Sequence, residues 1–433
     1  MRNKTLLPIH DPWFQTGALT LLISGVFLAI DFAPPISIHW YPNLPPSASA
    51  SGPRTTAGAA SGSPVAPSAR TPGSAHPAST PARRPTSGTH RSAAEDMALG
   101  ELAERHHDYG LAMRRYRQAV EQGSAEACEG VGALYEFGRG VKRDYRTAVR
   151  WYRDGAQRGS AGAQYSLGYS YATGRGVGQN YHSAMQWYRR AAAQGDCVAA
   201  VAIGAMYENG RGVPQNWGKA RRWWQKAAST GNSVAETDLG LMYANGIGVA
   251  QDFGKAIGWL RKAARQGNAD AQASLGGMYG NGMGVPVNYK KAIFWLSKAA
   301  LRGDAAAEQS IGALYSKGEG VNQNYRKALQ WYRKAAAQGN AQAATGIGYL
   351  YQRGWGVPQD YGAAMRWYRK AAARGNSEAE FYIGYLHQYG LGVAPDGDRA
   401  LFWYQKAAAQ GDAVAKMKIA CLKASNSQNS SKC

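Results

Sequence analysis

The sequence predicts an all-α protein, a right-handed α/α superhelical solenoid built from 36-residue helix-turn-helix units. Three features carry this prediction: a Gly-x-Gly-Val stretch, a tryptophan and a later glycine each recur at steps of 36 residues along most of the chain. A fixed period of this length is typical of repeat arrays, in which each unit buries its apolar surface against its neighbours.

The glycine pairs mark a turn between two helices. The pairs are Gly138/Gly140, Gly174/Gly176, Gly210/Gly212, Gly246/Gly248, Gly282/Gly284, Gly318/Gly320, Gly354/Gly356 and Gly390/Gly392, each followed by valine. Glycine adopts the positive φ that such a turn needs, and Pro214, Pro286 and Pro358 favour the start of the next helix. Eight copies argue against a dedicated phosphate-binding loop, and no Walker-type lysine follows the pairs.

Apolar residues within one unit recur at helical spacing in two segments. They are Ala271, Leu275, Met278 and Tyr279 in the first segment and Tyr289, Ala292, Trp295, Leu296 and Ala299 in the second. Gly303 is placed as a left-handed C-cap, and Asp304 as the N-cap of the next helix. Each unit is therefore two amphipathic helices with short connections.

The repeated pattern of glycines, tyrosines, tryptophan and alanines resembles the Sel1-like repeat family, which is closely related to tetratricopeptide repeats. The resemblance covers residues 94–423: a tetratricopeptide-like first unit, eight Sel1-like repeats and a closing helix at about 412–423. It implies a scaffold that binds protein or peptide partners, with neither enzyme activity nor a cofactor.

The segment before the repeats predicts a membrane tether. Residues 1–12 are a short N-terminus, and residues 13–30 are eighteen uncharged residues, which as a helix would extend about 27 Å. Arg2 and Lys4 precede this span, so the N-terminus is expected in the cytoplasm and the solenoid in the periplasm, anchored in the inner membrane. The alternative is a signal peptide that is cleaved, which would make the protein secreted.

Residues 31–93 are expected to be a disordered linker, because they hold 12 of the 18 prolines among Ala, Ser and Gly. Residues 424–433 are expected to be a disordered tail. The net charge is +22, of which +17 lies beyond residue 93, so the repeats themselves are basic. Such a field favours anionic partners, and the alternative function is binding of cell-wall glycan or another anionic polysaccharide. Nucleic acid would require a cytosolic solenoid.

No residue pattern indicates catalysis or a metal site. The four cysteines form no CxxC pair, and His106 and His107 are interpreted as a solvated helix end. The basic residue three after most tryptophans is interpreted as a cover for apolar surface near a helix C-terminus.

Positions that the repeat leaves variable are the candidates for partner binding. Related solenoids use the first helix of each pair to line a concave surface, and the aromatic residues mapped there are Phe137, Tyr165, Tyr169, Tyr349, Phe381, Tyr385 and Tyr389. Such rings could hold an extended peptide or stack on sugars. The residue between the two glycines also varies, and Trp355 in that position is expected to be an exposed contact at the loop edge.

Overall fold

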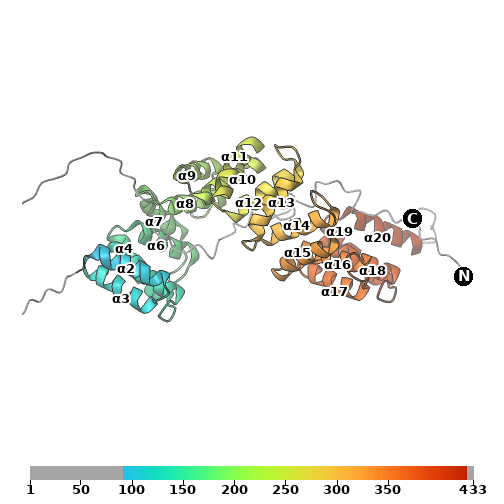
Figure 1. Cartoon of the computed structure of the whole chain (residues 1–433), viewed down its shortest axis with the longest axis horizontal. Coiled ribbons are helices and arrows are strands. Elements are labelled where there is room, and N and C mark those ends of the chain that lie inside the picture. Colours follow the sequence, from blue (N-terminus) through green and yellow to red (C-terminus); the bar gives the residue numbers. More distant parts are fainter. Residues whose placement is uncertain (1–90, 427–433) are drawn as a thin grey trace, which may run out of the picture. The chain divides into compact units, whose positions relative to one another are not determined.

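The computed structural model describes residues 91–426, which form 19 α-helices and no strand (Figure 1). This arrangement confirms the predicted all-α solenoid of 36-residue helix pairs. The predicted membrane anchor at 13–30, nearly all of the predicted linker and most of the predicted tail lie outside the described residues. Within residues 91–426, no helix has the length and apolar character needed to span a membrane.

The helices alternate between the first and the second helix of successive pairs. The first helices are α2 (Ala93–Arg105), α4 (Ala125–Phe137), α6 (Ala161–Thr173), α8 (Cys197–Asn209), α10 (Ser233–Asn245), α12 (Ala269–Asn281), α14 (Ala305–Lys317), α16 (Ala341–Arg353), α18 (Ser377–Tyr389) and α20 (Ala413–Asn426). The second helices are α3 (Tyr109–Glu121), α5 (Tyr145–Gln157), α7 (Tyr181–Ala193), α9 (Trp217–Ser229), α11 (Phe253–Arg265), α13 (Tyr289–Ala300), α15 (Tyr325–Ala337), α17 (Tyr361–Ala372) and α19 (Gly397–Ala409).

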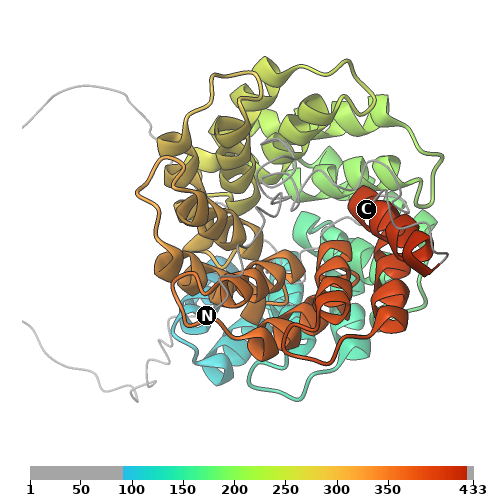
Figure 2. The same cartoon turned by 90° about the vertical axis from the view of Figure 1, so that its right-hand side faces the viewer.

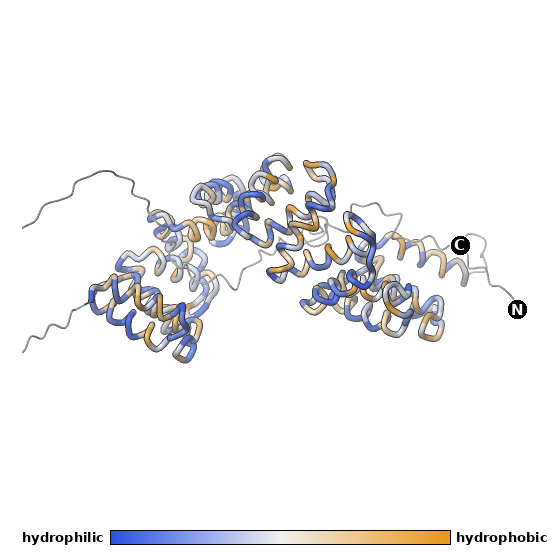
Figure 3. Tube along the Cα trace, in the orientation of Figure 1, coloured by the Kyte–Doolittle hydropathy of each residue, from blue (hydrophilic) through white to orange (hydrophobic). Residues whose placement is uncertain are grey.

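The described residues divide into two compact units. The N-terminal unit comprises residues 91–203 with 211–213, and the C-terminal unit comprises residues 204–210 with 214–426. In both units the first helices of neighbouring pairs contact one another, as α4 does with α6 and α12 does with α14. Figure 2 shows the same packing of successive pairs from a second direction. Each helix mixes polar and apolar residues along its length, as amphipathic packing requires (Figure 3).

Side chains at the helix ends explain where each helix starts and stops. α16 ends at Gly354, which takes the left-handed conformation at φ +70°. α17 starts after Asp360, whose carboxylate accepts a hydrogen bond from the Ala363 backbone N–H at 2.8 Å. At the next joint Asn376 caps α18 in the same way, through the Ala379 N–H at 2.8 Å. The predicted Gly303 and Asp304 joint has the same form, with Gly303 at φ +83° and Asp304 capping α14.

The second glycine of each pair is required by space as well as by backbone conformation. Gly356 has φ +71°, and a Cβ there would lie 2.8 Å from the Tyr325 carbonyl carbon. Tyr325 begins the second helix of the preceding repeat, so the loop packs directly on that helix end. An L-residue at Gly356 would therefore meet both an unfavourable φ and a backbone atom.

Within each pair, a large side chain of the second helix packs against a glycine of the first helix. A Cβ at Gly348 of α16 would lie 2.6 Å from Tyr368 Cε1 of α17, and Tyr368 is completely buried. The equivalent pairs are Gly132 with Tyr152, Gly168 with Tyr188, Gly204 with Trp224, Gly240 with Leu260, Gly276 with Leu296, Gly312 with Tyr332 and Gly384 with Tyr404. These glycines let the two helices approach closely enough to share one core.

The recurring tryptophan lies at the edge of the core, under a cation. The Lys334 ammonium is 4.3 Å from the centre of the Trp331 ring, and Lys370 is 4.4 Å from that of Trp367. The same contact joins Arg190 to Trp187, Lys226 to Trp223, Lys262 to Trp259, Lys298 to Trp295 and Lys406 to Trp403. The cations therefore cover half-buried rings, which adds a cation–π attraction to the burial of their stems.

Replacing Gly356 by alanine is expected to destabilise the C-terminal unit more than replacing Gly375. Both glycines have positive φ, but nothing lies within 4 Å of a Cβ at Gly375. Placing alanine at a positive φ lowers the free energy of unfolding by about 1–2 kcal/mol, and this loss is common to both variants. Overpacking at Gly356 adds roughly 1–3 kcal/mol. Urea unfolding followed by tryptophan fluorescence measures the difference, and equal midpoints would show that the approach of Tyr325 does not matter.

Candidate functional site

The variable aromatic residues of the first helices lie in both units. Phe137, Tyr165 and Tyr169 belong to the N-terminal unit, and the remaining four belong to the C-terminal unit. Phe137 is exposed at the end of α4, where Arg139 lies over its ring at 5.0 Å. Tyr165 and Tyr169 are half-buried, and the Tyr165 ring packs on Tyr188 with a centroid distance of 5.6 Å.

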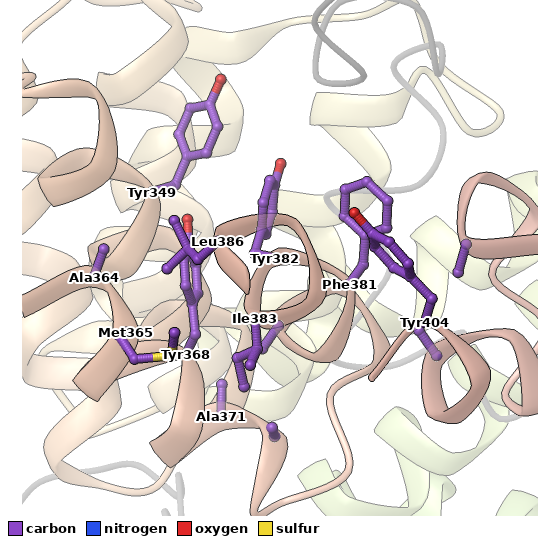
Figure 4. Packing of buried hydrophobic residues seen from close by; sticks show 14 of the residues in the cluster. Tyr349, Ala364, Met365, Tyr368, Ala371, Phe381, Tyr382, Ile383, Leu386 and Tyr404 are labelled. Carbon is purple, nitrogen blue, oxygen red and sulfur yellow. The ribbon is translucent and has the colours of Figure 1, made fainter. Parts of the chain in front are cut away.

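Two of the predicted partner-binding residues are core residues instead. Tyr349 and Phe381 are only 4% and 6% exposed. The Tyr349 ring packs on Tyr382 at 5.7 Å, and Phe381 packs on Tyr404 at 5.4 Å (Figure 4). The expectation that they are available on the surface is wrong, because aromatic rings from the following helices cover them.

Trp355 is half-buried, so the expectation of an exposed loop residue is also wrong. Its indole stacks on Tyr325 with centroids 4.8 Å apart, and it meets Tyr349 edge-on at 5.6 Å. In other repeats, too, the residue between the two glycines lies over an aromatic ring. There Arg139, Arg175 and Arg211 lie over the rings of Tyr109, Tyr145 and Tyr181 at 5.8, 5.9 and 5.8 Å. This variable residue therefore contacts the aromatic residue that begins the preceding second helix.

Tyr385 and Tyr389 form the most accessible aromatic pair of the predicted set in the C-terminal unit. They lie one turn apart on α18, with ring centroids 4.6 Å apart. Tyr389 is 48% exposed and Tyr385 is half-buried beside Phe381. Burial raises the pKa of Tyr385, so its hydroxyl stays protonated and can donate a hydrogen bond at neutral pH.

The closing helix adds a cation that sequence reasoning missed. Lys418 of α20 donates a hydrogen bond to the Tyr389 hydroxyl at 3.1 Å, and its ammonium is 5.6 Å from the ring centre. The repeat pattern gave no signal for this contact, because the position of Lys418 holds Tyr382, Gly346 and Ser310 in the three preceding first helices. In the preceding repeat, Arg353 of α16 lies over the Tyr349 ring at 5.2 Å.

The fold does not require aromatic rings at the Tyr385 and Tyr389 positions. In the other repeats the position of Tyr385 is occupied by Ala133, Tyr169, Ala205, Leu241, Gly277, Ala313 and Tyr349. The position of Tyr389 is occupied by Phe137, Thr173, Asn209, Asn245, Asn281, Lys317 and Arg353. Among the eight repeats the last alone has aromatic residues at both positions, and the pair provides apolar surface with hydroxyl groups on a rigid helix.

One first helix of the N-terminal unit carries a partly buried carboxyl group close to other negative charges. Glu129 of α4 is half-buried, and its pKa is raised to about 8. The main cause is burial, and the negative charges of Asp196 and Glu126 add to it. This carboxyl is therefore largely protonated at neutral pH.

Across residues 91–426, no group of three or more His, Cys, Asp or Glu side chains is placed to hold a metal ion. His106 and His107 are both exposed, and His107 Nδ1 is 2.8 Å from the Tyr109 hydroxyl. The chemistry that the described surface offers is that of aromatic rings, hydroxyl groups and charges, which is suited to binding.

The Glu129→Gln variant is expected to resist alkaline pH better than the parent chain. Because the pKa of Glu129 is about 8 when folded against a usual 4.5, folding stabilises the protonated form, and stability falls as pH rises between these values. The variant should have the higher unfolding midpoint at pH 8.5, and its advantage should disappear by pH 4.5. Thermal unfolding at both pH values checks this, with the exposed Glu121→Gln as control; parallel pH profiles for parent and variant would contradict it.

Comparison with known proteins identifies the repeat. The Sel1 repeat model matches eight consecutive segments: residues 125–160, 161–196, 197–232, 233–268, 269–304, 305–340, 341–376 and 377–412. The pair α2–α3 precedes the matched region. A comparison with curated protein sequences finds no match.

Two solved structures resemble the chain over most of its length. A Sel1 repeat protein from Oxalobacter formigenes is 31% identical, with a TM-score of 0.54, over 79% of this chain and 97% of that one. The protective antigen c5321 of uropathogenic Escherichia coli, which displays an SLR fold, is 31% identical, with a TM-score of 0.52, over 77% of this chain and 80% of that one. With eight matched repeats and the helix pairs described above, the chain belongs to the Sel1 repeat family.

Proposed function

We propose that the protein is a non-enzymatic, membrane-tethered scaffold that binds partner proteins or peptides through the first-helix surface of its repeats. Sel1 repeat solenoids are a type of protein-interaction scaffold. The proposal for this chain adds a particular surface, a tether at residues 13–30 and a periplasmic location for the repeats.

The observation that carries the proposal is the Tyr385 and Tyr389 pair. Tyrosine is enriched where proteins bind one another, because its ring buries a large area and its hydroxyl can pair at the edge of a contact. The two rings contact each other, which limits the side-chain entropy that would be lost on binding. Phe381 supports Tyr385 from the core at 6.5 Å, so the pair stands on a packed base.

The position of the pair on a first helix also supports partner binding. In each unit the contacts between like helices of neighbouring pairs are made by first helices, such as α2 with α4 and α14 with α16. First helices that converge in this way lie on the inner side of a bend, where an extended segment can contact several repeats at once. Tyr349 and Phe381 would then contribute by holding the exposed rings in place.

Replacing Tyr385 and Tyr389 together by alanine is expected to remove partners that the parent chain retains. The comparison is made by affinity purification of the full chain from its native cells, followed by mass spectrometry. The matched control replaces Phe294 and Phe402, which are 52% and 53% exposed on second helices, by alanine. Partners lost in the tyrosine variant and kept in the phenylalanine variant would support the first-helix surface. Identical partner sets for all three chains would refute it.

The tether is tested separately with a reporter enzyme that is active only outside the cytoplasm, fused after Cys433. Activity in the membrane fraction that disappears when residues 13–30 are deleted is the expected result, since that segment is the proposed anchor. A reporter that is inactive in the intact chain would place the repeats in the cytoplasm and overturn the proposed location.

A further inference from the structure

The two kinds of helix carry opposite charge. The nine first helices from α2 to α18 contain 14 acidic and three basic residues, whereas the nine second helices contain 28 basic and three acidic residues. The positive charge of the repeats is therefore concentrated on the second helices. In the C-terminal unit, α9, α11, α13, α15, α17 and α19 contribute 20 basic residues and a single acidic one, Asp398.

Four lysines occupy the same position on four consecutive second helices of this unit. They are Lys219 of α9, Lys255 of α11, Lys291 of α13 and Lys327 of α15, and all four are exposed. Each ammonium lies over a tyrosine ring of the first helix in its own pair. The distances to the ring centres are 5.4 Å for Tyr207, 5.4 Å for Tyr243, 5.3 Å for Tyr279 and 5.4 Å for Tyr315. We call these four residues the lysine row.

The solenoid does not need the lysine row in order to fold. The same tyrosine is present as Tyr135, Tyr171 and Tyr351, but there the second helix carries Thr147, Ser183 and Ala363 in place of lysine. The cation over the tryptophan behaves differently, because it recurs in seven repeats from Arg190 to Lys406. The last repeat has Arg399 at the lysine position and His387 at the tyrosine position. Lysine and tyrosine therefore occupy these two positions together only in the four middle repeats.

The caps beside the lysine row keep it positively charged. Asn216, Asn288 and Asn324 cap α9, α13 and α15 without adding charge. Only α11 has an acidic cap: Asp252 lies 3.1 Å from Lys255. Lys290 and Arg326, both exposed, stand next to the row and extend it.

From this row we infer that the second-helix surface of α9, α11, α13 and α15 binds a linear anionic polysaccharide. A polymer with negative groups along its whole length can contact cations that recur once in every repeat, and several weak contacts along one chain combine into useful affinity. Lysine provides compact point charges with freely rotating donors, which suits carboxylate or sulfate groups held in many orientations.

The row offers little to the bases of nucleic acid. Single-stranded nucleic acid binds most proteins by stacking its bases on open aromatic faces beside the charged groove. In the lysine row each tyrosine ring already has an ammonium over it, and the four lysines of the row lack the planar fork with which arginine reads bases. Sugar polymers need neither feature for charge recognition, so the polysaccharide is the better match.

The inference is tested with the full chain and immobilised polygalacturonate, a linear polymer of uronic acid. Converting Lys219, Lys255, Lys291 and Lys327 together to glutamine removes four exposed contacts, each of which contributes about 1.4- to 5-fold to affinity. The quadruple variant should bind at least about fourfold more weakly than the parent chain in 50 mM salt. Binding of the parent should also fall steeply at 1 M salt, where the screening length is only about 3 Å.

The control must lose as much charge without touching the row. Converting Arg146, Arg150, Arg153 and Arg366, all exposed on second helices, to glutamine does so. This control should stay within about twofold to threefold of the parent chain, and circular dichroism confirms that both variants are folded. Equal losses in the two variants would show that only net charge matters and would overturn the inference, as would absence of binding or tighter binding to polyuridylate than to polygalacturonate.

Discussion

The whole array depends on one steric constraint, the absence of a Cβ atom in the middle of the first helix of each pair. At Gly348 the ring of Tyr368 occupies the space that a methyl group would need. This contact sets the separation of the two helices in a pair, and the separation determines which positions face the next pair and which face water. In eight repeats the side chain that packs on this glycine belongs to tyrosine, leucine or tryptophan. The identity of the packing residue can therefore vary, whereas the glycine is constant.

The period of the sequence was sufficient to predict the helices, their caps and their turns, because these depend on residues close together in the chain. It was insufficient to decide which aromatic residues are exposed. Tyr349 and Tyr385 occupy the same position of the repeat, yet the Tyr349 ring is covered by Tyr382 and is buried, whereas Tyr385 is only half-buried. Phe381, one turn before Tyr385, is covered by Tyr404. Coverage depends on rings from neighbouring helices that vary from one repeat to the next. Lys418 was unpredictable for another reason, since no other first helix has a cation at the equivalent position.

The separation of charge between the helices gives one scaffold two chemically different surfaces. First helices combine acidic groups with tyrosines, and burial raises the pKa of Glu236, Glu308 and Glu380 above the usual value. Gln266, Gln338 and Gln410 each donate a hydrogen bond to one of them, at 2.7, 2.8 and 2.7 Å. Second helices carry cations above aromatic rings. A ligand on one surface need not compete with a ligand on the other, because they meet different helices of each pair.

The contact between each interhelical loop and the preceding second helix determines which insertions and deletions the fold tolerates. Trp355 reaches a ring 30 residues earlier, and Arg139, Arg175 and Arg211 do the same in their own repeats. Because every such partner lies less than one period away, an in-frame loss or duplication of 36 residues replaces each contact with an equivalent one. Recombination between repeats can therefore lengthen or shorten the protein in whole units while it remains foldable. Natural selection can then adjust the number of binding positions separately from their chemistry.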